Sequence, residues 1–251
     1  MTDLHNDVIT AMGAWRFARY IRRSAEAGVT TLFVSVWTTR MRNPMRRIRR
    51  YRARIDRVAA QNPSIKLHLH IEDAWFVNDG NIDRLLSYKP YSVGLTWNHE
   101  NPLAGGASAL GRLTPLGARV ATKLCDNGVY VDLAHLNRKS FFDVMAIIRA
   151  SGQRPLCTHT CFNEMCPHAR NLTRGQVRAI VDAGGTIGLT LVKKFLSPAK
   201  ATVADLYRHI DYFKRNFPHG NLGLGTDFFG GILVINDYRK LDEVYRRIEK
   251  S

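Results

Sequence analysis

Long apolar runs, a leader segment and closely spaced cysteine pairs are all missing from this sequence of 251 residues. No stretch is apolar over the length that a membrane-spanning helix needs, and Met1-Thr2-Asp3 leads directly into the first predicted strand. We therefore expect a cytoplasmic protein that is neither exported nor membrane-spanning. Without Cys-x-x-Cys spacing a structural zinc knuckle is not expected, and reduced thiols are predicted. The four cysteines are Cys125, Cys157, Cys161 and Cys166.

Acidic residues are also scarce. The chain has 21 Asp plus Glu against 37 Lys plus Arg, which gives a formal charge of +16 and a pI near 10.1. Such a surface attracts polyanions. Much of the excess lies between Arg40 and Arg54, where apolar residues recur at helical spacing. We favour an amphipathic helix with a solvated arginine face over a nucleic-acid surface, because aromatic residues suited to base stacking are sparse there.

Eight short apolar segments, often β-branched, alternate with helical patterns along the chain. The predicted strands span residues 3–7, 30–37, 65–73, 91–97, 128–135, 155–160, 185–192 and 222–228. The predicted helices span residues 14–27, 46–60, 81–87, 115–126, 139–150, 174–183, 203–217 and 237–250. Helix-start signals support two of them, with Thr114 before Pro115 and Thr173 three residues ahead of a glutamine.

This alternation predicts an α/β protein, a single (β/α)8 TIM barrel over residues 1–251. A doubly wound open sheet is the alternative. It is less favoured because no Gly-x-Gly-x-x-Gly turn follows the first strand, and because eight parallel strands more naturally close into a barrel.

Residues fit for metal or proton chemistry stand at the ends of the predicted strands. In His5-Asn6-Asp7 the imidazole and the carboxylate are two residues apart on a strand, so both point to the same face. Barrel enzymes carry their chemistry at the C-terminal ends of the strands, on one rim. A single strand-end histidine is more often structural, but the coincidence of seven such positions reverses that judgement. The seven are His5, Asp7, Glu72, His99, His135, His159 and Asp227.

The other histidines are expected to have structural or solvent-exposed positions. His68 and His70 share a strand face with Glu72, so we interpret them as interior polar residues, with His70 as the substitute ligand if Glu72 is misplaced. The remaining three fall in a loop, a helix and a turn. They are His168, His209 and His219.

Several segments, in this order, give the chain a resemblance to a known family. They are Asp3-Leu4-His5-Asn6-Asp7, Ile71-Glu72, Leu95-Thr96-Trp97-Asn98-His99, Leu113-Thr114-Pro115-Leu116-Gly117, Val131-Asp132-Leu133-Ala134-His135, Thr158-His159-Thr160, Arg170-Asn171-Leu172 and Gly225-Thr226-Asp227-Phe228. On these residues the chain resembles the zinc-dependent membrane (renal) dipeptidases, the M19 metallopeptidases. The resemblance runs from residue 3 to about residue 230.

The resemblance implies a barrel of the metallo-dependent hydrolase type that cleaves the amide bond of dipeptides or similar small amides, through a hydroxide held between two Zn²⁺ ions. It implies that His5 and Asp7 bind one ion, that His135 and His159 bind the other, and that Glu72 bridges both. Imidazole and carboxylate ligands suit Zn²⁺, and a pair of ions about 3.5–4 Å apart can polarise the scissile carbonyl.

The resemblance also assigns roles outside the ligand set. Asp227 would take the proton of the attacking water and deliver it to the leaving amine. His99 would stabilise the developing oxyanion, and Arg170 would pair with the terminal carboxylate of the substrate. The chain departs from the family pattern at Phe229, where the family usually has an aspartate.

Two other functions stay open at this point. One is a metal-dependent phosphoesterase or nuclease on the same barrel, which would use the basic charge; such enzymes commonly open with His-x-His, whereas this chain has Asp7 in the second position. The other is a non-catalytic binding member of the fold, against which the complete ligand set argues. Partners are expected to be small peptides, with nucleic acid and a membrane span not expected. The oligomeric state is not fixed by the sequence, and a homodimer is one alternative.

Overall fold

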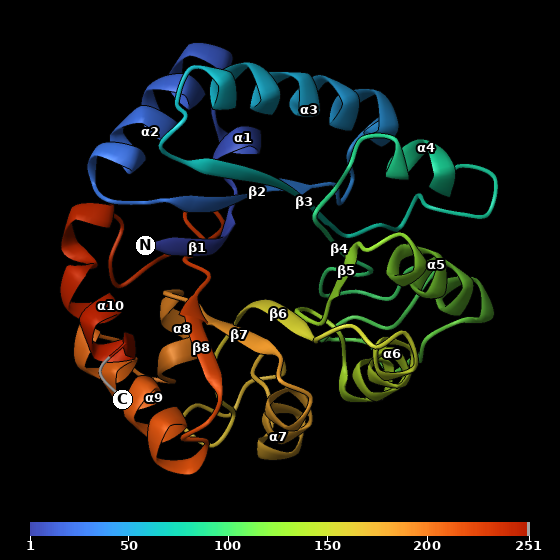
Figure 1. Ribbon diagram of the computed structural model, residues 1–251. Coiled ribbons are helices and arrows are strands. Elements are labelled where there is room, and N and C mark those ends of the chain that lie inside the picture. The colour runs from blue at the N-terminus through green and yellow to red at the C-terminus, as the bar shows by residue number, and fades with distance from the viewer. Residues whose placement is uncertain (250–251) are drawn as a thin grey trace.

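The computed structural model describes residues 1–249, which form a closed barrel of eight parallel strands hydrogen-bonded in sequence order. Figure 1 shows the strands at the centre and the helices around them. The prediction of a (β/α)8 barrel is confirmed. Most strands are shorter than the sequence indicated, because pairing stops where the chain turns out onto the rim. The strands are β1 Thr2–Asn6, β2 Thr31–Trp37, β3 Lys66–Glu72, β4 Ser92–Gly94, β5 Tyr130–Asp132, β6 Leu156–Thr160, β7 Thr186–Leu189 and β8 Asn221–Leu224.

The helices agree with the predicted ranges within a few residues, with two additions. The longer helices are α2 Ala14–Glu26, α3 Pro44–Ala60, α4 Ile82–Leu86, α5 Pro115–Asp126, α6 Arg138–Ala150, α7 Arg174–Asp182, α9 Val203–Asn216 and α10 Asp242–Glu249. The additions, α1 Val8–Ala11 and α8 Lys193–Leu196, are single turns. The predicted helix 237–250 begins instead with a 3-10 turn, η1 Tyr238–Lys240, and its last residue, Lys250, lies outside the described residues. No helix in residues 1–249 has both the length and the apolar character needed to cross a bilayer.

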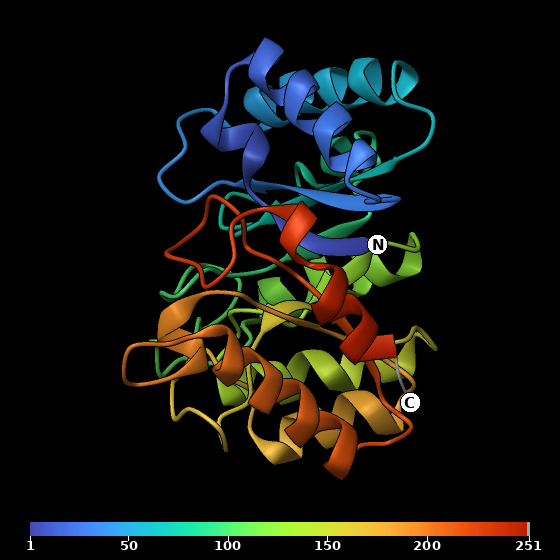
Figure 2. The same cartoon turned by 90° about the vertical axis from the view of Figure 1, so that its left-hand side faces the viewer.

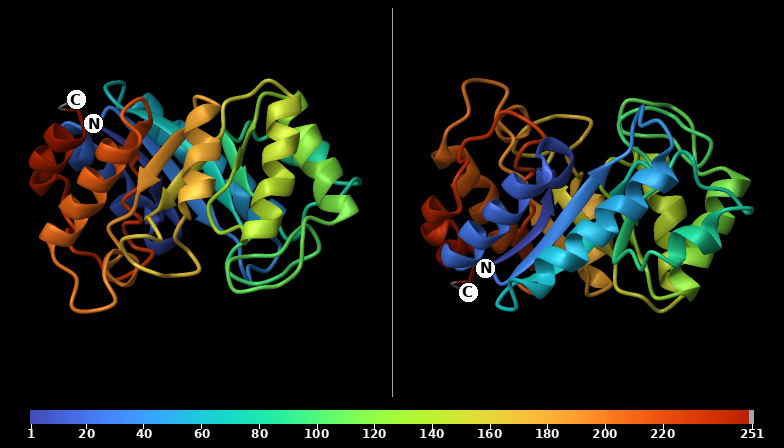
Figure 3. Two further views of the ribbon diagram at one scale, coloured as in Figure 1. Left: turned by 90° about the horizontal axis from the view of Figure 1, so that it is seen from below. Right: turned by 90° about the horizontal axis from the view of Figure 1, so that it is seen from above.

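The arginine-rich segment forms α3, on the outside of the barrel. Ile48, Ile55 and Val58 face the core and are buried. The two views of Figure 3 and the ribbon in Figure 2 show α3 lying beside α2 along this side of the molecule. The exposed side chains of α3 include Arg46, Arg47, Arg49 and Arg50.

All four cysteines are buried and unpaired. Cys161 Sγ donates to the carbonyl oxygen of Thr190 at 3.6 Å, and Cys166 Sγ donates to that of Lys194 at 3.8 Å. Burial raises the pKa of the Cys125, Cys157, Cys161 and Cys166 thiols. They therefore behave as small core residues.

Two seams of the barrel each hold one pair of residues in parallel register. At the seam between β1 and β8 the pair is Asp3 with Leu224, and the Asp3 carboxylate adds contacts that the ladder lacks. Its Oδ1 accepts from the His5 backbone N–H at 3.2 Å and from that of Thr226 at 2.8 Å. Its Oδ2 accepts from the Thr226 hydroxyl at 2.7 Å and from the Tyr238 hydroxyl.

The seam between β5 and β6 repeats this arrangement. Here the single pair is Asp132 with Leu156. Asp132 Oδ1 accepts from the backbone N–H groups of Ala134 at 3.1 Å and Thr158 at 2.8 Å, and Oδ2 accepts from the Thr158 hydroxyl at 2.5 Å. We call these two Asp–Thr contacts the strand clasps. Each joins neighbouring strands directly below the rim residues, His5 and Asp227 in one case and His135 and His159 in the other.

Removing one hydroxyl tests the first strand clasp. Thr226→Val removes one of the donors to the buried Asp3 carboxylate, and we expect the free energy of unfolding to fall by about 1–3 kcal/mol. Thr226→Ser keeps the hydroxyl and should lose much less. Urea denaturation of both variants measures the difference. Equal losses would show that the methyl group, rather than the hydrogen bond, accounts for the effect.

His209 is buried in α9, and its contacts favour the neutral imidazole. Its Nδ1 accepts from the Phe162 backbone N–H at 3.3 Å, and Nε2 lies 3.1 Å from the carbonyl oxygen of Leu196, to which it donates. Burial lowers the pKa of His209 from 6.5 to about 4. This position agrees with the structural role expected from the sequence.

The lowered pKa gives a stability prediction with a definite sign. Between pH 6.5 and about 4 the unfolded chain binds a proton at His209 that the folded chain does not, so the free energy of unfolding falls as the pH falls through this window. The total loss from this group is about 3 kcal/mol. His209→Gln removes it, so the difference between wild type and variant should shrink with falling pH. Parallel stability curves between about pH 7 and 4.5 would contradict this assignment.

Candidate active site

Six of the seven predicted rim residues come together at the C-terminal end of the barrel. His5 lies on β1 with Asp7 just beyond it, Glu72 ends β3, and His159 lies on β6. His135 and Asp227 follow β5 and β8. All six are buried. The expected convergence on one rim is therefore present in the structure, whereas the role of each residue as a ligand or a catalyst stays a prediction.

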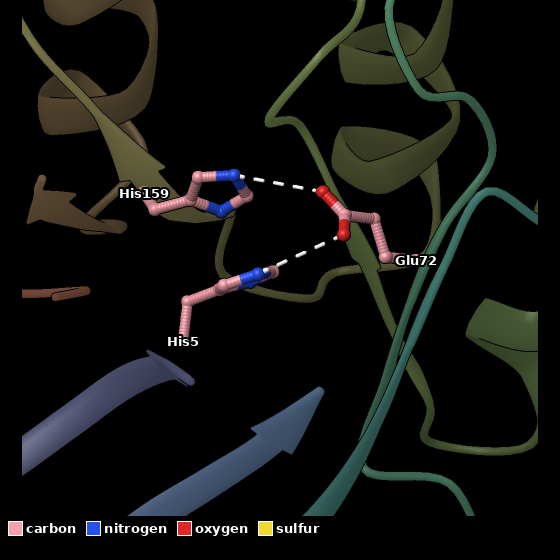
Figure 4. Close-up of side chains that lie close together, drawn as sticks. All are labelled: His5, Glu72 and His159. Atoms are coloured by element: carbon pink, nitrogen blue, oxygen red, sulfur yellow. Dashed lines mark ion pairs between the residues drawn. The ribbon is translucent and has the colours of Figure 1, made fainter. Parts of the chain in front are cut away.

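Glu72 faces three imidazoles, one with the first carboxylate oxygen and two with the second. Its Oε2 is 3.8 Å from His5 Nε2, while its Oε1 is 2.8 Å from His135 Nε2 and 3.7 Å from His159 Nε2. Figure 4 shows one carboxylate oxygen directed at His5 and the other at His159, with both rings on the same side of Glu72. One carboxylate is thus shared by both halves of the site.

The tautomers of His135 and His159 are fixed by contacts on the far side of each ring. His135 Nδ1 lies 2.9 Å from Asn98 Oδ1, which can only accept. His159 Nδ1 lies 2.9 Å from the Thr158 hydroxyl, whose own proton goes to Asp132. Both Nδ1 atoms therefore carry the hydrogen, and both Nε2 lone pairs point into the site, where they lie 2.9 Å apart.

Electrostatics keep these two rings neutral. Burial, and secondarily Arg170, lowers the pKa of His135 well below its ordinary value. Burial, and secondarily His5, does the same for the pKa of His159. Two neutral imidazoles with facing lone pairs repel each other unless something electron-poor lies between them, which is the arrangement that binds a cation.

His5 behaves differently. Burial alone would lower its pKa, but the Asp7 and Glu72 carboxylates outweigh burial and raise the pKa to about 10. Its Nε2 is 3.5 Å from Asp7 Oδ2 and makes no hydrogen bond within residues 1–249. Burial raises the pKa of Glu72 well above its ordinary value. A proton on His5 therefore balances the carboxylates, and a metal cation would displace that proton on binding.

The donor set fits metal ions. Ligand atoms of His5, Glu72 and His159 lie within 4.8 Å of one another, and so do those of His5, Asp7 and Asp227. Asp7 Oδ1 is buried and has no hydrogen-bond partner in the part of the chain that the structure describes. Imidazole nitrogen and carboxylate oxygen, with lone pairs left free in a buried site, are ligands typical of Zn²⁺.

Asp227 combines a raised pKa with a fixed backbone. Burial, followed by the neighbouring Asp7 carboxylate, raises the pKa of Asp227 to about 7. The backbone holds it in place, since its N–H donates to the His5 carbonyl oxygen at 3.0 Å. Asp227 and His135 both have left-handed backbone conformations, with φ of 58° and 65°. Each costs about 1–3 kcal/mol, and such strain is concentrated at functional sites.

A cavity of about 580 Å³ opens above these groups. Its floor carries Asp7, Glu72, His135 and Asp227. The rest of the lining is mainly apolar and comes from the segments after β2, β4, β7 and β8. These lining residues are Trp37, Trp97, Val192, Phe195, Phe229 and Ile232, together with Lys193 and Lys194.

Two predicted residues lie outside both the buried cluster and this lining. His99 is exposed on the rim, with its ring centroid 5.7 Å from that of Trp97. Arg170 is buried behind His159, where Nη2 donates to the His159 carbonyl oxygen at 2.9 Å. Its Nε is buried without a hydrogen-bond partner in the described chain, and its Cζ lies 5.6 Å from the ring centroid of Phe195.

The interior histidines of β3 lie at two levels. His70 is buried beneath Glu72, with Nδ1 2.8 Å from the Ser92 hydroxyl and its ring centroid 5.2 Å from that of His5. His68 lies lower, half-buried against Tyr91 at a centroid distance of 4.2 Å. His168 is half-buried in a loop and His219 is exposed.

Sequence reasoning did not single out the residues that support the histidines. Asn98 and Thr158 fix two tautomers, and Asp3 and Asp132 hold the strand clasps. A signal was present, because each Asp precedes a rim histidine by two or three residues and each Thr immediately precedes a rim residue. Which Asp bonds which Thr depends on the order of strands in the closed barrel.

A family model and individual proteins are similar to this chain. The family described as membrane dipeptidase (peptidase family M19) matches residues 38–250. An uncharacterised protein of the pqqA 5′ region in Klebsiella pneumoniae is 29% identical over 153 residues, which is 55% of this chain and 55% of that protein. The dipeptidase aclJ of Aspergillus oryzae is 25% identical over 134 residues, 52% of this chain and 30% of that protein. The chain thus matches about half the length, or less, of these curated relatives.

A solved structure shares the fold. The metallopeptidase from Rhodobacter sphaeroides, bound to a phosphinate mimic of the dipeptide L-Ala-D-Ala, superposes with a TM-score of 0.78 and 18% identity. The match covers 100% of this chain and 93% of that one.

Gly230 provides a test of the carboxylate arrangement. A Cβ added there would lie 2.0 Å from Asp227 Oδ1 and 2.6 Å from Asp7 Oδ2, so Gly230→Ala must push these carboxylates aside. We expect the affinity for added Zn²⁺, measured by calorimetry, to fall roughly 10–100-fold. Gly231→Ala is the matched control, since its Cβ would approach only Val192, at 3.3 Å. Equal affinities in the two variants would exclude these carboxylates from the metal site.

Proposed function

Because the chain belongs to the membrane dipeptidase family, peptidase family M19, we propose that it hydrolyses the amide bond of dipeptides or similar small amides with two Zn²⁺ ions as its cofactor. The observation that carries this proposal is the position of Glu72, which has one oxygen near His5 and the other near the His135–His159 pair. A shared carboxylate between two nitrogen-bearing half-sites is what a two-metal site requires.

The proposed ligands follow from the geometry of each half. His5 and Asp7 would hold one ion and His135 and His159 the other, with Glu72 contributing to both. The facing lone pairs of His135 and His159, 2.9 Å apart, and the unpartnered His5 Nε2 support this division. When bound, the ions supply Lewis acidity that polarises the scissile carbonyl and lowers the pKa of water.

Asp227 would carry the proton. A carboxyl group whose pKa is raised to about 7 accepts a proton from the attacking water and gives it up to the leaving amine near neutral pH. Its backbone bond to β1 keeps the carboxylate over the ligands. Gly230 has no side chain and so leaves room for the carboxylates of both Asp227 and Asp7.

The substrate-binding roles are proposals of the same kind. Arg170 has its Nη2 occupied by the His159 carbonyl, so the buried, unpartnered Nε is the donor available to a substrate carboxylate. We assign the developing oxyanion to His99, which lies on the rim beside the cavity-lining Trp97.

A phosphoesterase on the same barrel is less well supported. The arginines of α3 are not among the residues that line the cavity, so they do not add phosphate-binding groups to the site. The lining itself is largely apolar, which suits peptide side chains better than a nucleic-acid backbone.

Substrate assays and the removal of one proposed metal-binding side chain distinguish a dipeptidase from a phosphoesterase. With Zn²⁺ present, we expect the wild type to cleave dipeptides and to leave a phosphodiester intact. Glu72→Ala and His135→Ala should each lower kcat/KM for dipeptides about 100-fold or more and lower the zinc content found by elemental analysis.

The control is neutralisation of Arg46, Arg47, Arg49 and Arg50 together, which should leave dipeptide turnover nearly unchanged. Turnover of the phosphodiester alone, or full activity in Glu72→Ala, would overturn the proposal.

A further inference from the structure

The mouth of the cavity exposes an unusual amount of large apolar surface. Six large hydrophobic side chains are exposed within residues 1–249, and three of them line this one cavity. They are Trp37, Phe229 and Ile232, with 37%, 44% and 76% of their surface exposed. Apolar surface gathered at one concave place is typical of a ligand-binding site, because covering it releases water.

Two walls face each other across the metal-binding floor. One comes from the ends of β2 and β4, where Trp37 and Trp97 pack edge to face at a centroid distance of 5.5 Å. Trp97 continues to the floor, with its ring 6.2 Å from that of His135. The other wall comes from the segments after β7 and β8, which are tied together by the Lys193 backbone N–H donating to the Ile232 carbonyl at 2.9 Å. β2–β4 and β7–β8 stand on opposite sides of the barrel.

Positive charge lies only on the second of these walls. The cavity lining includes Lys193 and Lys194 there, and no charged side chain on the wall of Trp37 and Trp97. Lys194 Nζ lies 4.9 Å from the Phe195 ring centroid, and Arg170 Cζ lies 5.6 Å from the same ring. The two cations thus flank one aromatic ring at the edge of the site.

This asymmetry sets the direction of a bound dipeptide. The carboxylate of the substrate goes to the cationic wall, and the amide lies over the ligands on the floor. The N-terminal side chain then faces the tryptophan wall. A cavity of about 580 Å³ accommodates a dipeptide with a bulky side chain.

We infer that the site selects dipeptides with a large apolar or aromatic N-terminal residue, which packs against the wall formed by Trp37 and Trp97, and that Lys194 binds their C-terminal carboxylate. This inference rests on the proposed dipeptide hydrolysis. It adds a specificity wall and a carboxylate-binding lysine to that function.

The first experiment compares substrates on the Zn²⁺-loaded protein. Phe-Ala should be cleaved with a kcat/KM at least about 10-fold above that of Gly-Ala, since a single methylene in an apolar pocket is worth roughly 10–200-fold. Trp37→Ala should lower kcat/KM for Phe-Ala much more than that for Gly-Ala and so abolish most of this preference, and circular dichroism of the variant checks that it is folded. Trp15→Ala is the matched control, because Trp15 is 65% exposed on α2 and does not line the cavity.

The second experiment removes the cation. Lys194→Met should raise KM for Phe-Ala about 5- to 10-fold and leave that for Phe-Ala amide unchanged, because only the former carries the carboxylate. Lys200→Met, also exposed but outside the cavity, is the control.

The possible outcomes distinguish failure of the inference from failure of the proposed dipeptide hydrolysis. Equal cleavage of Phe-Ala and Gly-Ala, or equal effects of Lys194→Met on acid and amide, overturns the inference and leaves dipeptide hydrolysis standing. Failure to cleave any dipeptide of the panel overturns the proposed function, and the inference with it.

Discussion

The site depends on two buried carboxylates that close the barrel. Asp3 and Asp132 each sit at a seam with one residue pair in register, and each accepts two backbone N–H groups and a threonine hydroxyl from neighbouring chain segments. Three hydrogen-bond donors offset the free energy that it costs to bury a carboxylate. Removing one donor makes the buried carboxylate less favourable and lowers the free energy of unfolding. The strand clasps therefore fix the spacing between neighbouring strands directly below the rim residues, where this spacing determines how close the candidate ligands lie.

The same clasps also orient the candidate ligands. Thr158 connects Asp132 to His159 Nδ1, so the carboxylate that joins β5 to β6 also sets the direction of an imidazole lone pair. On the other seam, the Asp3 carboxylate holds the His5 backbone, and the His5 carbonyl in turn accepts from Asp227. Fold and site are thus built from shared hydrogen bonds, which explains why the rim residues lie so close in a protein whose β4 and β5 have three residues each.

Much of the architecture could be predicted from the sequence, because strands of a closed parallel barrel are buried on both faces and read as short apolar runs. The rim positions followed from the same rule, as His5, Glu72 and His159 show. The two four-residue helices α1 and α8 were not predicted, because one turn is too short to display an apolar period. The exposed position of His99 could not be predicted either, because β4 ends three residues earlier than the apolar character of the segment indicates.

Long-range contacts account for the rest. Asn98 and His135 are 37 residues apart, and Asp3 and Thr226 are 223 residues apart, so nothing local marks them as partners. The arginines of α3 illustrate the opposite case, in which a conspicuous sequence feature lies outside the site. At physiological salt their influence is screened beyond about 8 Å, so the chemistry on the rim is governed by Asp7, Glu72 and Asp227 rather than by the net charge.

The four buried thiols have a consequence for the conditions under which this molecule keeps its structure. Cysteines react as thiolates, and burial holds all four in the protonated form. The fold uses no disulfide within residues 1–249, so reductants have no covalent bond to break there, and oxidants find no ready nucleophile among these four. The described part of the barrel is therefore held together without a covalent cross-link that the glutathione balance around it could reduce.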